Sequence, residues 1–128
     1  MISLILMALS GACKAVMDLS ADGKPFRWGG DSSYWSKSES WVRKYENNDP
    51  KQGPKFFLST TVFVNFTDAW HLFQSINYFL IVAAIVLYSP ITPIKIKLLS
   101  VFVDFAIIKL AHQSFFHAFY TWIFRAKK

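Results

Sequence analysis

The sequence is poor in charge and in cysteine. Only 17% of its 128 residues are charged, against about 25% in a typical soluble domain. The single cysteine, Cys13, excludes an intramolecular disulfide and a zinc site built from several cysteines. There is also no HExxH motif, no glycine-rich phosphate loop and no nucleophile elbow. The sequence therefore gives no support to the enzyme classes that these three motifs mark.

Long apolar runs are what the sequence has instead. Residues 56–88 contain one formal charge, Asp68, in 33 residues, and residues 98–124 form a second run. About 20 mostly apolar residues are enough to cross the hydrocarbon core of a bilayer. The chain is 53% hydrophobic, and monomeric soluble proteins avoid the large exposed apolar patches that this composition would produce. The pattern predicts an all-α membrane protein with about three transmembrane helices.

These helices would form a single membrane domain covering residues 1–128. Its predicted parts are a first helix at about 1–17, a hydrophilic loop at 18–55, an interfacial segment at 56–66, a second helix at about 67–88 and a third at about 98–124. A break at Thr67-Asp68 is favoured because an aspartate at a helix start accepts hydrogen bonds from unpaired N–H groups and suits the helix dipole. The alternative is one long tilted helix over all of residues 56–88.

The first helix has three interpretations. A cleaved secretory signal normally opens with positive charge, and here no Lys or Arg precedes Lys14. A lipoprotein signal would place its aliphatic residue three positions before the cysteine, whereas Leu9 lies four before Cys13. A retained transmembrane helix is favoured. Its small residues, Ser10 to Ala12, would let a neighbouring helix approach closely.

The hydrophilic loop is rich in aromatic residues, which disordered segments lack. Tryptophan favours the headgroup level of a membrane, and basic side chains flank membrane spans. We therefore predict an aromatic-rich interfacial loop, with five anchors at the membrane surface: Trp28, Trp35, Trp41, Trp122 and Arg125.

The basic residues predict an orientation. Three crossings place residues 18–55 and the C-terminus on one side, with ten Lys and Arg residues, and leave Lys95 and Lys97 on the other. The positive-inside rule then puts the loop and the C-terminus in the cytoplasm. The location would be a bacterial inner membrane or a virion membrane. Although the net charge is +6, no basic stripe or recognised motif is present, so we expect no nucleic-acid partner.

Several ionisable residues interrupt the apolar runs. Charged groups inside a membrane cost roughly 2.5–3.5 kcal/mol each on insertion scales, so they usually face a partner or a cavity. In the first interpretation Asp68 caps a helix, and Lys109 pairs with Asp104 or Asp68 to specify helix pairing. No cofactor is then expected.

A divalent metal site is the second interpretation. Asp68 and His71 lie one helical turn apart and suit metal ligation. His112 and His117 are five residues apart, about 140° around a helix, so an unbroken helix cannot direct both at one metal. The candidate ligand set is Asp68, His71 and one of His112 or His117.

Four segments of the sequence resemble a known group of proteins. They are Ser40–Tyr45 (SWVRKY), Asp49–Gly53 (DPKQG), Ser59–Val64 (STTVFV) and Thr67–Phe73 (TDAWHLF). The group comprises small uncharacterised membrane proteins of Bacteroidota and their phages, and the resemblance covers about residues 1–90. It implies a membrane location and a bacterial or viral context. It supplies no activity.

A second resemblance is to membrane-bound metal-dependent hydrolases, which carry Asp-x-Asp-His and His-Arg-x-x-Thr-His elements. Residues 68–71 (DAWH) lack the second acid of the first element. Residues 112–117 (HQSFFH) keep the histidine spacing of the second element but lack its Arg and Thr. These departures remove much of what such a site needs.

Three functions are thus open. The favoured one is a structural or assembly role in a cell envelope or virion membrane, with the bilayer and other membrane subunits, or further copies of the chain, as partners. The alternatives are a membrane-embedded metal-dependent enzyme and a holin-like pore former. The long aromatic loop fits a pore former poorly.

Overall fold

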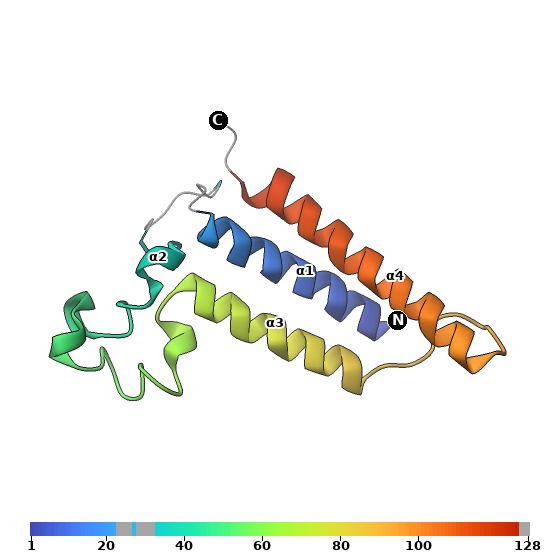
Figure 1. Cartoon of the computed structure of the whole chain (residues 1–128), viewed down its shortest axis with the longest axis horizontal. Coiled ribbons are helices and arrows are strands. Elements are labelled where there is room, and N and C mark those ends of the chain that lie inside the picture. Colours follow the sequence, from blue (N-terminus) through green and yellow to red (C-terminus); the bar gives the residue numbers. More distant parts are fainter. Residues whose placement is uncertain (23–26, 28–32, 126–128) are drawn as a thin grey trace.

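The computed structural model describes residues 1–22, 27 and 33–125 of the chain (Figure 1). All regular elements within these residues are helices, as predicted. The three long ones are α1 (Ile2–Ala21), α3 (Ala69–Val86) and α4 (Lys97–Ala118), and α4 continues as a π-helical segment, η4 (Phe119–Phe124). Each of the three is long and apolar enough to span a membrane.

The helix limits differ in places from those predicted. α1 continues to Ala21, past the predicted end at residue 17, because Leu19 and Ser20 are buried at the end of the bundle. The break before α3 is confirmed: Asp68 is its N-cap, with an extended backbone. The single helix over residues 56–88 was therefore the wrong alternative. Residues 56–66 instead form turns and a short 3-10 helix, η3 (Val64–Phe66).

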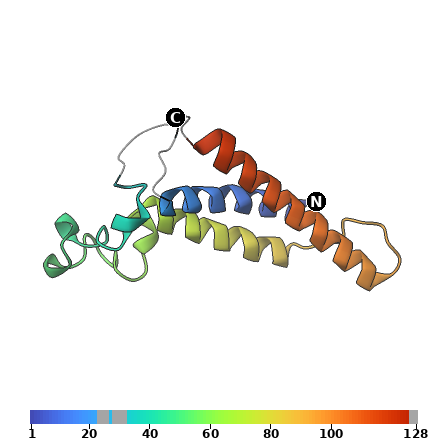
Figure 2. The same cartoon turned by 45° about the horizontal axis from the view of Figure 1, so that its top comes forward.

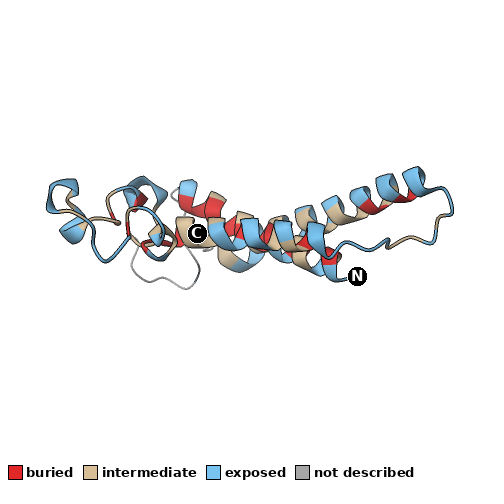
Figure 3. Ribbon diagram, turned by 90° about the horizontal axis from the view of Figure 1, so that it is seen from below, coloured by how far each residue is buried: buried red, intermediate tan, exposed pale blue. Residues whose placement is uncertain are grey.

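α1 is the central helix of the bundle. It runs antiparallel to α3 and parallel to α4, which lie on either side of it (Figures 1 and 2). Both outer helices pack on α1, and these two described helices have no close backbone contact with each other. As a result 56% of the α1 span is buried, against 17% for α3 and 11% for the α4 span. Figure 3 shows how much of α4 is exposed.

Small residues allow the close packing of α1 that the sequence predicted. A Cβ atom on Gly11 would overlap with the carbonyl oxygen of His112 in α4, and it would lie 3.1 Å from the backbone nitrogen of Phe116. On the α3 side, the buried Ser10 hydroxyl donates a 2.7 Å hydrogen bond to the side-chain oxygen of Asn77. The α1–α4 contact is therefore made through backbone atoms, and the α1–α3 contact contains a buried polar pair.

An apolar cluster closes the C-terminal end of α1. Val16 and Leu19 are fully buried, and partly buried side chains from the other helices and the loop pack against them: Trp35, Phe73, Tyr120 and Phe124. Tyr120 also donates a 2.6 Å hydrogen bond from its hydroxyl to Asp22. The end of α1 and the end of α4 thus lie together, which places the start of the hydrophilic loop beside the C-terminal segment.

The segment between Ser33 and Thr67 projects beyond this end of the bundle (Figure 1). Its described helices are short: α2 (Lys37–Ser40), η1 (Glu46–Asn48), η2 (Pro50–Gln52) and η3. A reversal of the chain pairs the Lys55 amide with the Lys44 carbonyl at 2.9 Å. Phe57, Val62 and Phe66 are exposed. Whether residues 56–66 meet a membrane interface stays a prediction.

We expect substitution of Gly11 to weaken the bundle. Gly11→Leu would place a side chain where the backbone of α4 lies, and overpacking of this kind costs about 1–3 kcal/mol. Thermal unfolding in detergent, followed by circular dichroism, measures the loss. Ala21→Leu, which adds bulk at an exposed position of the same helix, is the control. Equal stability of the two variants would contradict the close α1–α4 contact.

Candidate functional site

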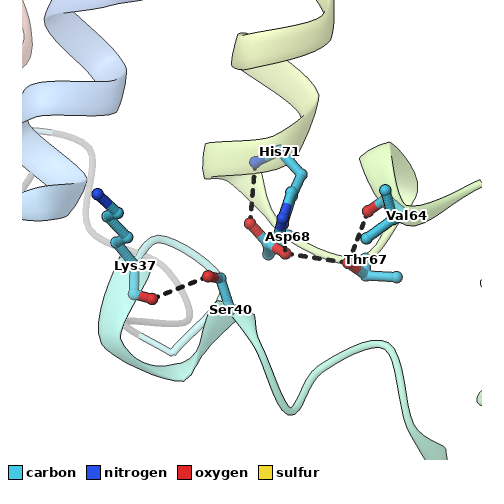
Figure 4. A network of polar contacts seen from close by, with 6 residues as sticks. All are labelled: Lys37, Ser40, Val64, Thr67, Asp68 and His71. Carbon is cyan, nitrogen blue, oxygen red and sulfur yellow. Dashed lines mark hydrogen bonds and ion pairs between the residues drawn. The ribbon is translucent and has the colours of Figure 1, made fainter. Parts of the chain in front are cut away.

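The strongest polar site of the predicted set is centred on Asp68. Its side chain is fully buried and caps α3, accepting a 3.0 Å hydrogen bond from the backbone N–H of His71 (Figure 4). The Thr67 hydroxyl also donates to Asp68, at 3.0 Å. An aspartate in an extended conformation just before a helix is the ordinary N-cap arrangement, and its charge suits the positive end of the helix dipole.

His71 makes a second contact with the same carboxylate. Its ring Nδ1 lies 2.7 Å from Asp68 Oδ2 (Figure 4), while its side chain is 22% exposed. A carboxylate bound to one ring nitrogen of a histidine fixes the tautomer and the orientation of the ring. The predicted Asp68–His71 pair is thus formed, and the Nε2 atom is left as the nitrogen able to accept a proton or a metal ion.

Residues of the hydrophilic loop, Tyr34 and Lys37, lie close to the start of α3. The Ala69 amide donates a 3.0 Å hydrogen bond to the Tyr34 carbonyl, which holds the loop against the start of α3. Burial raises the pKa of the Tyr34 phenol above its ordinary value; the charge of Asp68 adds to this rise and Arg43 opposes it. The Lys37 ammonium lies 4.8 Å from the centre of the Trp70 ring, a cation–π distance.

The other two candidate ligands lie elsewhere. His112 packs at Gly11, in the middle of α1, whereas Asp68 lies at the end of the bundle where α1 finishes. His117 is exposed on α4. Within the described part of the chain, no group of three or more His, Cys, Asp and Glu residues is arranged to hold a metal ion. The structure therefore brings together only Asp68 and His71 of the predicted set.

Asp104 forms a second polar network at the opposite end. Its fully buried carboxylate accepts four hydrogen bonds from the loop between α3 and α4. One oxygen accepts from the Tyr88 hydroxyl and the Ile91 amide, both at 2.8 Å. The other accepts from the Thr92 amide at 3.0 Å and the Thr92 hydroxyl at 2.8 Å. These four donors occupy both oxygens of the Asp104 carboxylate.

The predicted ion pair of Lys109 is not formed. Lys109 is exposed on α4, and among the described residues it makes no ion pair with Asp68 or Asp104. Both carboxylates already receive their hydrogen bonds from nearby backbone and hydroxyl groups. The expectation that Lys109 pairs with either acid was wrong for this reason.

The predicted interface anchors fall into three groups. Trp41 and Trp122 are 60% and 70% exposed, as an anchor requires. Trp35 is half-buried instead, 6.3 Å from Phe73 between ring centroids, so it belongs to the cluster at the end of α1. Arg125 is half-buried. Trp28 lies outside the described residues.

Known proteins do not place the chain in a family. No protein-family model, curated protein or solved structure matches it. The likeness to small membrane proteins of Bacteroidota and their phages stays a prediction. The function of the two carboxylate networks must be inferred from their own contacts.

Sequence reasoning missed the partners of Asp104 and the Ser10–Asn77 pair. Tyr88 and Thr92 precede Asp104 by 16 and 12 residues, and no helical spacing connects them. A signal was nevertheless present, because Thr92 lies between Pro90 and Pro93, in a turn whose amides need an acceptor.

Substitution of Asp68 tests the capping role. Asp68→Ala removes the side-chain acceptor for the His71 amide at the start of α3, and loss of an N-cap costs about 0.5–2 kcal/mol. Asn is as good an N-cap as Asp, so Asp68→Asn should lose less stability. Unfolding in detergent measures both variants. An Asn variant as unstable as the Ala variant would show that the charge on Asp68, rather than its capping, stabilises the bundle.

A pH titration tests the Asp104 network. The hydrogen bond to Asp104 raises the pKa of the Tyr88 phenol, and burial adds to this rise. Because the pKa of Tyr88 is higher in the folded chain, its hydrogen bond to Asp104 contributes its full stability below the ordinary tyrosine pKa of about 10. That stability is lost as the pH rises through the pKa of the folded chain. Absorbance of tyrosinate and stability, both measured as the pH rises above the ordinary tyrosine value of about 10, should show this loss in the native chain. Tyr88→Phe should remove it, and an unchanged profile would contradict the assignment.

Proposed function

We propose that the chain is a small polytopic integral membrane protein with a structural or assembly role in a cell envelope or virion membrane. The main support is that the outside of the bundle, on α3 and α4, is apolar. Large apolar side chains on α3 and α4 are exposed, among them Tyr78, Phe79, Val82, Val86, Phe102, Phe105 and Leu110. In water this surface would promote aggregation, whereas in lipid it is the favoured exterior.

The helix lengths agree with a bilayer. At about 1.5 Å per residue, α1 and α3 are roughly 30 Å and 27 Å long, and the hydrocarbon core is about 30 Å thick. α4 with η4 is longer, and a longer helix adapts by tilting or by extending into the interface. Buried Asp68 and Asp104 lie towards opposite ends of the bundle, where a charge costs less than at the centre.

An assembly role suits the way the polar residues are used. Asp68 holds the preceding loop at the start of α3, Asp104 holds the α3–α4 loop against the side of α4, and Ser10 and Asn77 join two helices. The exposed Phe57, Val62 and Phe66 beyond the bundle offer a surface for an interface or a partner subunit. These contacts build and position the protein.

The two alternatives have less support. A metal-dependent enzyme keeps only the Asp68–His71 contact, because His112 and His117 lie elsewhere. A pore through a single chain has no path along the bundle axis, since α1 occupies the centre and touches the α4 backbone at Gly11. Only an assembly of several chains could supply the further metal ligands that the enzyme needs or the channel that the pore former needs.

A charge on the outer face of α3 distinguishes a membrane protein from a soluble one. Phe79 is 71% exposed near the middle of α3. In water Phe79→Arg would change stability by less than about 0.5 kcal/mol, but in a bilayer it costs about 2.5–3.5 kcal/mol. We expect it to deplete the chain from the membrane fraction after alkaline carbonate extraction. Gln52→Arg, which adds the same charge at an exposed site outside the three long helices and outside residues 56–66, is the control and should leave the chain in the membrane fraction.

The orientation is tested with reporters at each end. A reporter active only outside the cytoplasm should work at the N-terminus, and one active only inside should work in the loop and at the C-terminus. The reverse pattern would contradict the positive-inside assignment. Native chain that carbonate releases from the membrane, together with an unaffected Phe79→Arg variant, would overturn the proposed insertion itself.

A further inference from the structure

An apolar groove lies between α3 and α4 above the first half of α1. Its volume is about 370 Å³, and side chains from all three helices line it: Met7, Ile81, Ile85, Val101, Phe105 and Ile108. At about 1.5 Å per residue, the α4 part from Val101 to Ile108 extends roughly 10 Å along the helix. The groove exists because α3 and α4 pack on α1 and leave a space between themselves.

A second cavity continues the groove at the α3–α4 loop. It measures about 320 Å³, and its lining includes Tyr88, Thr92, Lys95, Lys97 and Ser100. Tyr88 and Val101 line both cavities, so the two adjoin. The lining changes here from the apolar side chains of the groove to the hydroxyl and ammonium groups of the second cavity.

The charge of the second cavity is positive. Lys95 and Lys97 are the charged residues in its lining, both are exposed, and neither is ion-paired within the described part of the chain. Asp104 lies nearby but is fully buried, and four hydrogen bonds compensate its carboxylate. The Thr92 hydroxyl donates to Asp104, which leaves the two ammonium groups to recognise an anion.

We propose that the two cavities together bind one anionic phospholipid, with an acyl chain in the groove and the phosphate at Lys95 and Lys97. The inference rests on the proposed membrane insertion. Ammonium groups attract anionic headgroups by their charge, and a lysine near the surface of a leaflet that contains anionic lipid contributes about 1 kcal/mol. An acyl chain gains from burying its methylene groups against the apolar lining.

The size of the groove disfavours a helix as its occupant. A helix with side chains is about 10–12 Å across and rises 5.4 Å per turn, which is roughly 400–600 Å³ for each turn. The whole groove, which extends along about two turns of α4, holds less than one such turn. A thin, flexible hydrocarbon chain can lie within this space, whereas a transmembrane helix from a partner or a second copy could place only some of its side chains in it.

Native mass spectrometry tests the headgroup part. The chain is released from mixed micelles containing equal amounts of phosphatidylcholine and phosphatidylglycerol, and the retained lipid is identified. We expect one phosphatidylglycerol per chain. Lys95→Gln with Lys97→Gln should weaken the preference roughly 30-fold, from about 1 kcal/mol for each lysine. Lys51→Gln with Lys55→Gln removes the same charge from exposed sites in the other loop and should have no effect.

Filling the groove tests the acyl-chain part. Ile85 lines the groove and is 69% exposed, so Ile85→Trp adds bulk there without disturbing the core. Retained lipid of either headgroup should be lost. The neighbouring Val86 is 75% exposed and is not among the residues that line the groove, so Val86→Trp should keep the lipid. Circular dichroism confirms that both variants are helical.

Three results would overturn the proposal. These are equal retention of the two lipids by the native chain, equal behaviour of the two double lysine variants, and a lipid-free dimer in which a second copy covers the groove. Carbonate extraction is scored first. A chain that carbonate releases refutes the proposed insertion and the lipid site with it, whereas an inserted chain without lipid preference refutes the lipid site alone.

Discussion

The close approach of α1 and α4 at Gly11 is the contact on which the bundle depends. Because the glycine lacks a side chain, the carbonyl of His112 lies against the α1 backbone, and the two helices run side by side with little between them. In lipid, helices associate by van der Waals packing and hydrogen bonds, since the surrounding tails are as apolar as the side chains. A small residue at this position therefore decides whether α1 can be the shared centre.

The central position of α1 has a consequence for the other two helices. α3 and α4 each bury one face on α1, and they do not complete a closed three-helix bundle with a common core. The space left between them is the apolar groove. The groove thus arises from the packing of the three helices alone, because α3 and α4 each pack on α1 and leave a space between them.

The two buried carboxylates, at opposite ends of the bundle, both accept hydrogen bonds from backbone groups where the chain changes direction. Asp68 accepts the unpaired N–H group at the start of α3, and Asp104 accepts two amides and two hydroxyls of the following loop. A buried backbone group without a hydrogen-bond partner costs free energy, so acids in these places stabilise the chain reversals. Because both carboxylates accept hydrogen bonds from residues that lie near them in the chain, neither forms an ion pair with Lys109.

The sequence by itself determined the features that depend on neighbouring residues. Apolar runs of sufficient length predicted three helices, and the Asp68 cap followed from an acid just before an apolar helix, three residues from its hydrogen-bond donor. Small residues in α1 predicted a close contact. The interfacial role of residues 56–66, the orientation and the function are still predictions.

Only the tertiary structure decided which distant residues meet. The partners of Asp104 lie 12 to 16 residues before it, across a turn whose path depends on two prolines and on the packing of α4. The histidines of α4 are separated from His71 because α1 lies between their helices, a fact that no spacing along the chain contains. Local hydrogen bonds can be predicted from sequence because the helix sets their geometry, whereas contacts between helices depend on which faces fit together in three dimensions.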